Sequence, residues 1–198
     1  DDKGSFLSSY ENSSRSPQNI RLSTAALDYS TTTKRLQFNA GAKVYNVRSN
    51  SGWDFTSGGS ITDNQFLYRE QNYALYADGT ISWKKVAARM GLRGEYTYLS
   101  THSYFPSTDS LNTQHYFKLF PTVYVQYTIN DDNLLILSAN RRINRPDYYR
   151  LNPFNYYVTP YFITSGNPFL RPSLDYAVRM DYVLKNNYTF SLFYNYTK

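Results

Sequence analysis

The chain has 198 residues, a formal net charge of +6 and no cysteine. One domain can therefore bury a core, whereas a disulfide or a thiolate metal site is excluded. No apolar run approaches the ~18 residues of a transmembrane helix. The basic residues are spread along the chain instead of forming a nucleic-acid-binding module, so we expect no nucleic-acid partner.

Eight segments alternate apolar and polar side chains, with the period of two that places them on opposite faces of a β-strand. In the second segment, Leu36, Phe38, Ala40, Ala42 and Val44 are apolar, and polar residues or glycine separate them. The predicted strands span residues 20–30, 34–47, 71–81, 85–99, 116–129, 134–142, 174–184 and 188–197.

The connections between these segments alternate short and long. The short ones are tight turns such as Asn130-Asp131-Asp132-Asn133, whose side chains can bond the nearby backbone. The long ones span residues 48–70, 100–115 and 143–173 and are predicted to be loops. Outer-membrane β-barrels have this asymmetry of short and long connections. Their girdles of aromatic side chains at the two membrane interfaces would account for the 22 Tyr and 12 Phe. A soluble, Tyr-rich, sugar-binding sheet protein remains the alternative.

The alternation also predicts the two faces of the sheet in an intact barrel. Basic and acidic side chains of the polar set should face the lumen: Lys43, Arg89, Arg93, Arg179 and Asp181. Apolar side chains of the other set should face lipid: Leu36, Phe38, Ala40, Val44, Val86, Ala88, Met90, Leu92, Tyr176, Val178, Met180 and Tyr182. In water, an isolated fragment would have to cover that apolar face, and dimerisation would do so.

The longest connection holds proline-containing elements in a fixed order. A strand ends in Arg141-Arg142-Ile143-Asn144-Arg145-Pro146, then come Leu151-Asn152-Pro153-Phe154 and Gly166-Asn167-Pro168-Phe169-Leu170-Arg171-Pro172. Pro146 cannot donate to a strand ladder, so the strand should stop near Arg145. Gly166-Asn167 supplies a turn before Pro168.

This order of elements resembles the barrel of TonB-dependent receptors, especially a branch widespread in gut and environmental Gram-negative bacteria. Weaker matches to the family lie at residues 36–47, 73–77 and 88–96, and Phe169 is an extra residue relative to the family pattern. The motif residues are Arg141, Arg142, Asn144, Arg145, Pro146, Asn152, Pro153, Phe154, Gly166, Asn167, Pro168 and Pro172.

The resemblance implies an all-β, antiparallel up-and-down transmembrane barrel in the outer membrane of a Gram-negative bacterium. Eight strands would be about a third of the family's ~22. Residues 1–19 are expected to be an extracellular loop or a vector-derived start, and residues 20–198 a partial barrel without its plug domain. The implied function is import of a glycan, peptide or metal chelate. The implied partners are outer-membrane lipid and lipopolysaccharide, the TonB motor acting through the plug, and a surface substrate-binding lipoprotein.

Six aromatic residues fall in predicted outside loops: Trp53, Phe55, Tyr156, Tyr157, Tyr161 and Phe162. Such rings can stack on a sugar or clamp a peptide, or they can pack the loops together. The strand-end residues Arg141, Arg142 and Arg145 are expected at the outer rim. There they could bind an anionic headgroup or solute, or pair with a local carboxylate such as Asp147.

Enzymatic interpretations find little support. His102 and His115, the only histidines, share a predicted loop with Asp109, but their spacing does not match a closed metal site. The sequence has no GxSxG elbow and no Gly-rich phosphate cradle. We therefore expect no catalysis, no cofactor and no metal. A self-closed small barrel acting as an adhesin or anchor remains an alternative to transport.

Overall fold

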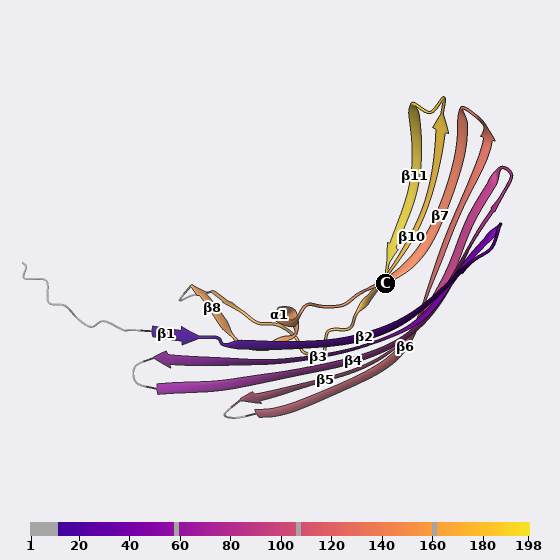
Figure 1. The fold of residues 1–198 in the computed structure, drawn as a ribbon. Helices are drawn as coiled ribbons and strands as arrows, with labels where there is room; N and C mark the ends of the chain where they lie inside the picture. The colour runs from indigo at the N-terminus through magenta and orange to yellow at the C-terminus, as the bar shows by residue number, and fades with distance from the viewer. Residues whose placement is uncertain (1–11, 58–59, 106–107, 160–161) are drawn as a thin grey trace, which may run out of the picture.

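The computed structural model describes residues 12–57, 60–105, 108–159 and 162–198, and one curved antiparallel sheet dominates it (Figure 1). Its eight main strands are β2 (Gln18–Thr32), β3 (Leu36–Ser57), β4 (Ser60–Trp83), β5 (Val86–Phe105), β6 (Thr108–Asn130), β7 (Asn133–Asn144), β10 (Ser173–Leu184) and β11 (Tyr188–Thr197). Each pairs with the next in chain order, so the predicted all-β, up-and-down topology is confirmed.

The smaller elements are β1 (Asn12–Arg15), α1 (Tyr148–Leu151), β8 (Tyr156–Thr159) and β9 (Phe162–Thr164). Strand β1 pairs with the far end of β3, where Arg15 lies opposite Asp54, and so continues the line of β2 (Figure 1). The described part of the predicted loop at residues 1–19 therefore contains β1 and the start of β2.

The four tight turns lie together at the same end of the strands. Neighbouring turns are hydrogen-bonded, since the Ser82 amide donates to the Arg35 carbonyl (3.2 Å) and the Asn186 amide to the Asp132 carbonyl (3.1 Å). The Asn130 side chain accepts from the Asp132 amide at 3.1 Å, as the turn chemistry predicts. Lys84 has a positive φ of 47°, which the tight turn requires.

Two of the three predicted long loops are wrong, because the strands continue through them. The β3–β4 ladder extends to the pair Ser57–Ser60, and the β5–β6 ladder to the pair Phe105–Thr108. Beyond Val44, the outward side chains become polar while the inner face takes a mixture of apolar and hydroxyl side chains. The apolar alternation that marks a strand therefore ends before the strand does. Of the three predicted loops, the connection from β7 to β10 is the one whose described residues leave the main sheet.

The predicted assignment of side chains to two faces is confirmed, because directly paired residues point to the same face. One set of register partners crosses seven strands on the convex face: Leu36, Ile81, Ala88, Val125, Leu137, Met180 and Leu192. On the concave face, Lys43 lies in register with Ala74 and Ala74 with Glu95.

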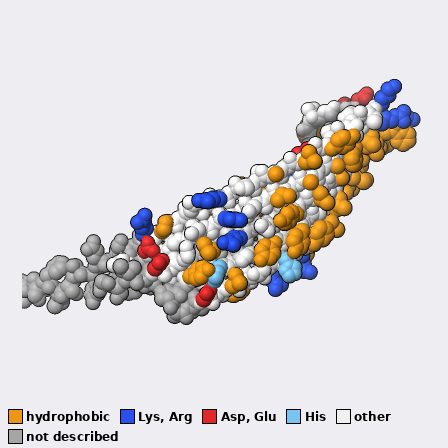
Figure 2. Space-filling model, turned by 60° about the horizontal axis from the view of Figure 1, so that its bottom comes forward, with side chains coloured by type: hydrophobic (Ala, Val, Ile, Leu, Met, Phe, Trp, Pro, Cys, Tyr) orange, Lys and Arg blue, Asp and Glu red, His pale blue; other side chains and the backbone are white. Residues whose placement is uncertain are grey.

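The convex face carries a broad apolar belt in the half nearest the tight turns (Figure 2). Exposed aromatic residues lie at both margins, with Trp83, Tyr127 and Tyr188 near the turns and Tyr73 and Phe117 at the far side. This arrangement is typical of the two girdles of a membrane barrel. No helix in the described ranges is long and apolar enough to cross a membrane.

Candidate functional site

The connection from β7 to β10 folds into the concave side of the sheet (Figure 1). We call its described residues, 145–159 and 162–172, the inward loop. Strand β7 ends at Asn144, as the proline at position 146 predicts. Asp147 then caps α1, accepting a hydrogen bond from the Arg150 amide at 2.9 Å. The Asn152 amide closes this short helix by donating to the Tyr148 carbonyl at 3.1 Å.

The two proline-containing motif elements of the inward loop meet at Gly166. The Gly166 amide donates to the Asn152 carbonyl (2.9 Å), and the Asn167 amide donates to the Arg150 carbonyl (2.7 Å). A Cβ at position 166 would lie only 2.5 Å from the Asn152 oxygen, and closer still to that of Arg150. The family motif thus places a glycine where two backbone segments touch.

Each element also contains an asparagine that braces its own turn. The Asn152 side chain accepts from the Phe154 amide at 3.1 Å, and the Asn167 side chain accepts from the Phe169 amide at 2.9 Å. The Asn112 side chain of β6 donates to the Pro168 carbonyl at 3.0 Å, which ties the second element to the sheet.

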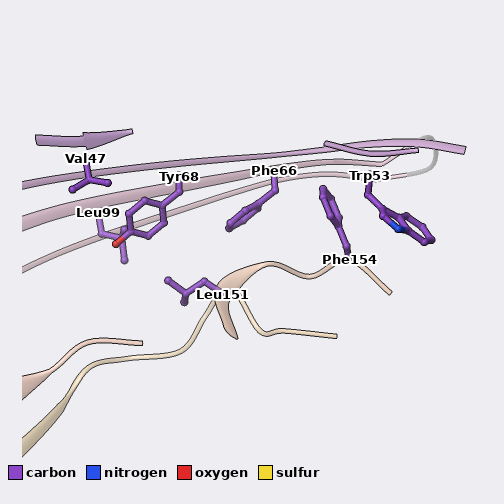
Figure 3. Close-up of a cluster of buried hydrophobic side chains, with 7 residues drawn as sticks. All are labelled: Val47, Trp53, Phe66, Tyr68, Leu99, Leu151 and Phe154. Atoms are coloured by element: carbon purple, nitrogen blue, oxygen red, sulfur yellow. The ribbon is translucent and has the colours of Figure 1, made fainter. Parts of the chain in front are cut away.

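An aromatic cluster fixes the inward loop on β3, β4 and β5 (Figure 3). Phe154 is 0% exposed and lies between Trp53 (centroids 6.4 Å apart, nearly parallel) and Phe66 (6.5 Å, edge-to-face). Tyr148 packs edge-on against Tyr68 at 4.6 Å. The whole buried cluster comprises Val47, Trp53, Phe66, Tyr68, Leu99, Leu151 and Phe154.

Trp53 packs the inward loop onto the sheet. It is only 6% exposed and lies on strand β3, not on a loop. Its ring stacks on that of Phe154 in the inward loop. Its predicted role in ligand binding stays a prediction.

Arg145 is the centre of a buried polar network. Its Nη2 donates to Glu95 Oε2 (2.7 Å) and to Thr97 Oγ1 (3.3 Å), and its Nε lies 3.2 Å from Glu70 Oε1. The predicted rim position of Arg145 is therefore corrected, because the chain turns inward at Pro146 and carries the guanidinium with it. Asp147, the expected local partner, caps α1 instead.

The two glutamates are held by further partners. The hydroxyl groups of Tyr45 and Tyr68 each donate a hydrogen bond to a carboxylate oxygen of Glu70 at 2.5 Å. The Asn72 side chain donates a hydrogen bond to Glu95 at 3.1 Å. Burial and the charge of Glu70 raise the pKa of Tyr68, so its hydroxyl remains a donor. Burial lowers the pKa of Arg145, but its hydrogen bond to Glu95 and the electrostatic attraction of the neighbouring acidic groups together outweigh burial and raise this pKa.

The other predicted arginines lie elsewhere. Arg141 is on the convex face with its guanidinium 5.2 Å from the centre of the Tyr176 ring. Arg142 is exposed and in register with Asp175, and Asn144 is in register with Ser173. The structure thus separates the three arginines and brings only Arg145 to the inward loop.

Of the remaining predicted aromatic residues, Phe162 is the one whose side chain the structure describes. Phe162 lies on β9 and is 59% exposed. Phe55 lies on β3 and Tyr156 and Tyr157 on β8, but the described side chains do not include theirs. Tyr161 lies outside the described residues. Their predicted role in ligand binding stays a prediction.

Two hollows open on the concave face, and the inward loop lines one of them. One, of about 440 Å³, is lined by aromatic, charged and small polar groups that include Lys43, Tyr45, Glu70, Arg145 and Tyr148. The other, of about 600 Å³, lies nearer the tight turns and includes Tyr76, Asp78, Arg89, Arg93 and Tyr124. Both offer charges and aromatic rings together, which suits polar organic solutes.

Sequence reasoning missed the partners of Arg145. Glu70, Tyr45 and Tyr68 fell in or beside predicted loops, so nothing placed them on one face. A glutamate between hydroxyl and aromatic residues of an inner strand face is the signal that could have indicated them.

His102 forms an ion pair with Asp109 on the convex face. The described part of the chain holds no group of three metal-ligating side chains.

A sequence model of the outer membrane protein beta-barrel family matches residues 2–198. The chain belongs to this family. No curated protein matches the sequence. Among solved structures, the ferric yersiniabactin uptake receptor FyuA from Yersinia pestis is similar, with a TM-score of 0.67 and 12% sequence identity over 93% of this chain. The chain spans 30% of that receptor, and at this identity the likeness shows the fold.

Membership in this family indicates which environment each face of the sheet contacts. The protein lies in the outer membrane of a Gram-negative bacterium, and the convex apolar belt faces lipid. The concave face, with the inward loop and both hollows, faces the barrel interior. Short turns of such barrels are periplasmic, so the extended ends of β3–β6 project outside the cell.

Proposed function

We propose that this chain is part of a TonB-dependent receptor that imports a nutrient across the outer membrane. The inward loop carries the proposal, because it is anchored at several points across the inner face of the sheet and lines the smaller of the two hollows. A wall element of a solute path must hold one shape, and the loop is held by both an ion-pair network and a buried aromatic cluster.

The lining of the hollows supports an organic solute with polar groups. In the larger hollow the Arg93 guanidinium lies 5.2 Å from the Tyr76 ring centre, and Arg89 donates to Asp78 at 3.0 Å. In the smaller one, Lys43 and Glu70 lie near Tyr45 and Tyr148. Rings with neighbouring charges fit a glycan, a peptide or a metal chelate. The proposal gives the chain a transport role and no catalytic one.

The edges of the sheet support a larger closed barrel. Within the described residues, β2 pairs only with β3 and β11 only with β10. Unpaired backbone groups cannot face hydrocarbon. We propose that further strands pair with both edges, that a plug domain fills the barrel and transmits the pull of the TonB motor, and that a surface lipoprotein delivers the substrate.

Uptake by living cells tests this function. Labelled oligosaccharides, short peptides and ferric chelates are offered to the native strain, a strain lacking the gene and a strain lacking TonB. We expect uptake of at least one of these classes to be lost in both deletion strains. The full-length gene should restore it, and so should the control variant Arg150→Gln, whereas Arg145→Gln should restore it poorly. If both deletions leave uptake of all three classes unchanged, the proposed import is wrong.

A further inference from the structure

Three arginines lie side by side on the convex face of the sheet. Arg21 of β2 is the register partner of Arg48 of β3, and Arg48 is the register partner of Arg69 of β4. All three are exposed. We call them the arginine row. Lys and Arg side chains are visible beside the apolar belt on this face in Figure 2.

The arginine row lies just beyond the outer margin of the belt. The belt's run of small and apolar outward residues on these strands ends at Ala25, Val44 and Tyr73, and each arginine follows or precedes one of them by four positions. Four strand residues span about 13 Å. At a barrel strand tilt of about 35–45° this is roughly 10 Å of height, which an extended arginine can bridge back toward the membrane surface.

No carboxylate neutralises the arginine row in the described part of the chain, where none of the three forms an ion pair. The outward carboxylates of the same strands, Asp54 and Asp63, are six positions farther out, about 20 Å away. Like charges on directly paired residues repel. A bound anion would remove that repulsion.

The surface among the arginines is also hollowed. A depression of about 270 Å³ lies there, and its outward-facing lining comprises Asn19, Arg21, Arg48, Asn50, Leu67 and Arg69. Two asparagine side chains thus add neutral hydrogen-bonding groups to three guanidinium groups. Leu67 adds apolar surface on the same side. Guanidinium groups match phosphate oxygens in bidentate geometry, and amides suit sugar hydroxyls.

We infer that the arginine row binds the phosphate groups of lipopolysaccharide in the outer leaflet. The inference rests on the outer-membrane location and on the geometry of the row, and it is independent of the proposed import. Its chemistry differs from that of the concave hollows, because it combines three like charges with a lipid-facing belt directly below.

The test uses the full-length protein purified in detergent. The variant Arg21→Gln/Arg48→Gln/Arg69→Gln is compared with Arg35→Gln/Lys84→Gln/Lys185→Gln, which removes the same charge from exposed turns at the opposite margin of the belt. Binding of bisphosphorylated lipid A and of dephosphorylated lipid A is measured by native mass spectrometry. Inorganic phosphate is the competitor.

The native protein should prefer bisphosphorylated over dephosphorylated lipid A. We expect the affinity to fall about fivefold per arginine lost and on the order of a hundredfold for all three, while the turn variant binds as the native protein does. If the triple variant does not fold, Arg48→Gln alone should lose about fivefold. A triple Arg→Lys variant, which keeps the charge but not the bidentate fork, should bind with intermediate affinity.

Three results would overturn the inference. The first is equal binding of phosphorylated and dephosphorylated lipid A by the native protein. The second is an unchanged affinity in the arginine variants, or an equal loss in the turn variant. The third is displacement of lipid A by an equimolar amount of inorganic phosphate, which would identify a site for free anions instead.

Discussion

Arg145 follows a strand directly in the sequence, yet its side chain bonds two glutamates on distant strands. The side chains of Glu70 and Glu95 are only 6% and 10% exposed, and burying a carboxylate costs free energy unless it is paired with a positive charge. The arginine therefore stabilises two buried charges as well as the first residues of the inward loop.

Arg145→Gln should destabilise the protein by roughly 3–5 kcal/mol, because it leaves two buried carboxylates short of a positive charge. The unfolding temperature in detergent, followed by the shift in gel mobility on heating, measures this loss. Arg150→Gln is the control, since Arg150 is 73% exposed and lies 3.8 Å from Asp147. Equal unfolding temperatures for the two variants would mean that the network does not stabilise the fold.

Gly166 is the residue where the motif is most sensitive to a single methyl group. Gly166→Ala would push a Cβ into two carbonyl oxygens of the Arg150–Asn152 segment, and we expect a cost of about 1–3 kcal/mol. Gly79→Ala is the matched control, because the nearest atom to its new Cβ would be 3.7 Å away. Trypsin cleavage after Arg150 or Arg171 should accelerate in the first variant only. Unchanged cleavage would contradict the close contact.

Among the elements, the inward loop depends on Phe154 more than on its short helix. A four-residue helix has little stability of its own, whereas Phe154 is completely buried between strands and loop. The loop is thus held by its contacts with the sheet. Its mobility should follow the strength of those contacts.

Phe154→Ala should remove about 3–5 kcal/mol of packing between loop and sheet. Tryptic cleavage within the inward loop should then rise by on the order of a hundredfold while the barrel itself stays folded. Phe162→Ala, at a ring that is 59% exposed, should change cleavage little. Similar cleavage rates in the two variants would show that the aromatic cluster does not fix the loop.

The sequence predicted the elements well where one face of the strand is apolar. The belt halves of β3, β5 and β10 were placed on the correct faces because each alternates strictly. The outer halves of β3–β6 are predicted as loops because their outward side chains are polar and their inward side chains mix apolar with hydroxyl groups. Periodicity in hydropathy disappears there although the backbone ladder continues.

The site was less predictable than the fold, for a related reason. The sequence correctly predicts a turn at Gly166-Asn167, but a turn motif does not say which way a loop folds. The inward direction depends on Glu70 and Glu95, which are separated from Arg145 in sequence and become neighbours only through strand register. Pairwise long-range contacts of this kind carry no local signal.

At the scale of the whole molecule, the convex belt must contact lipid. Met90 is 59% exposed on this belt, and Met90→Arg should destabilise the barrel in a bilayer by about 2–4 kcal/mol. Asn50→Arg, on the same face but beyond the belt, should cost less than about 1 kcal/mol. Urea unfolding in lipid vesicles measures both. Equal costs would mean that the belt is not in the hydrocarbon.

The most direct measurement uses the absence of native cysteine in the chain. Single cysteines are placed at Met90 in the belt, Asn50 beyond the belt and Lys84 in a tight turn, each in the full-length protein. Intact cells are then treated with a membrane-impermeant maleimide. The account predicts labelling at position 50, and protection at positions 90 and 84. Labelling of positions 90 and 84 in intact cells, with position 50 protected, would contradict it.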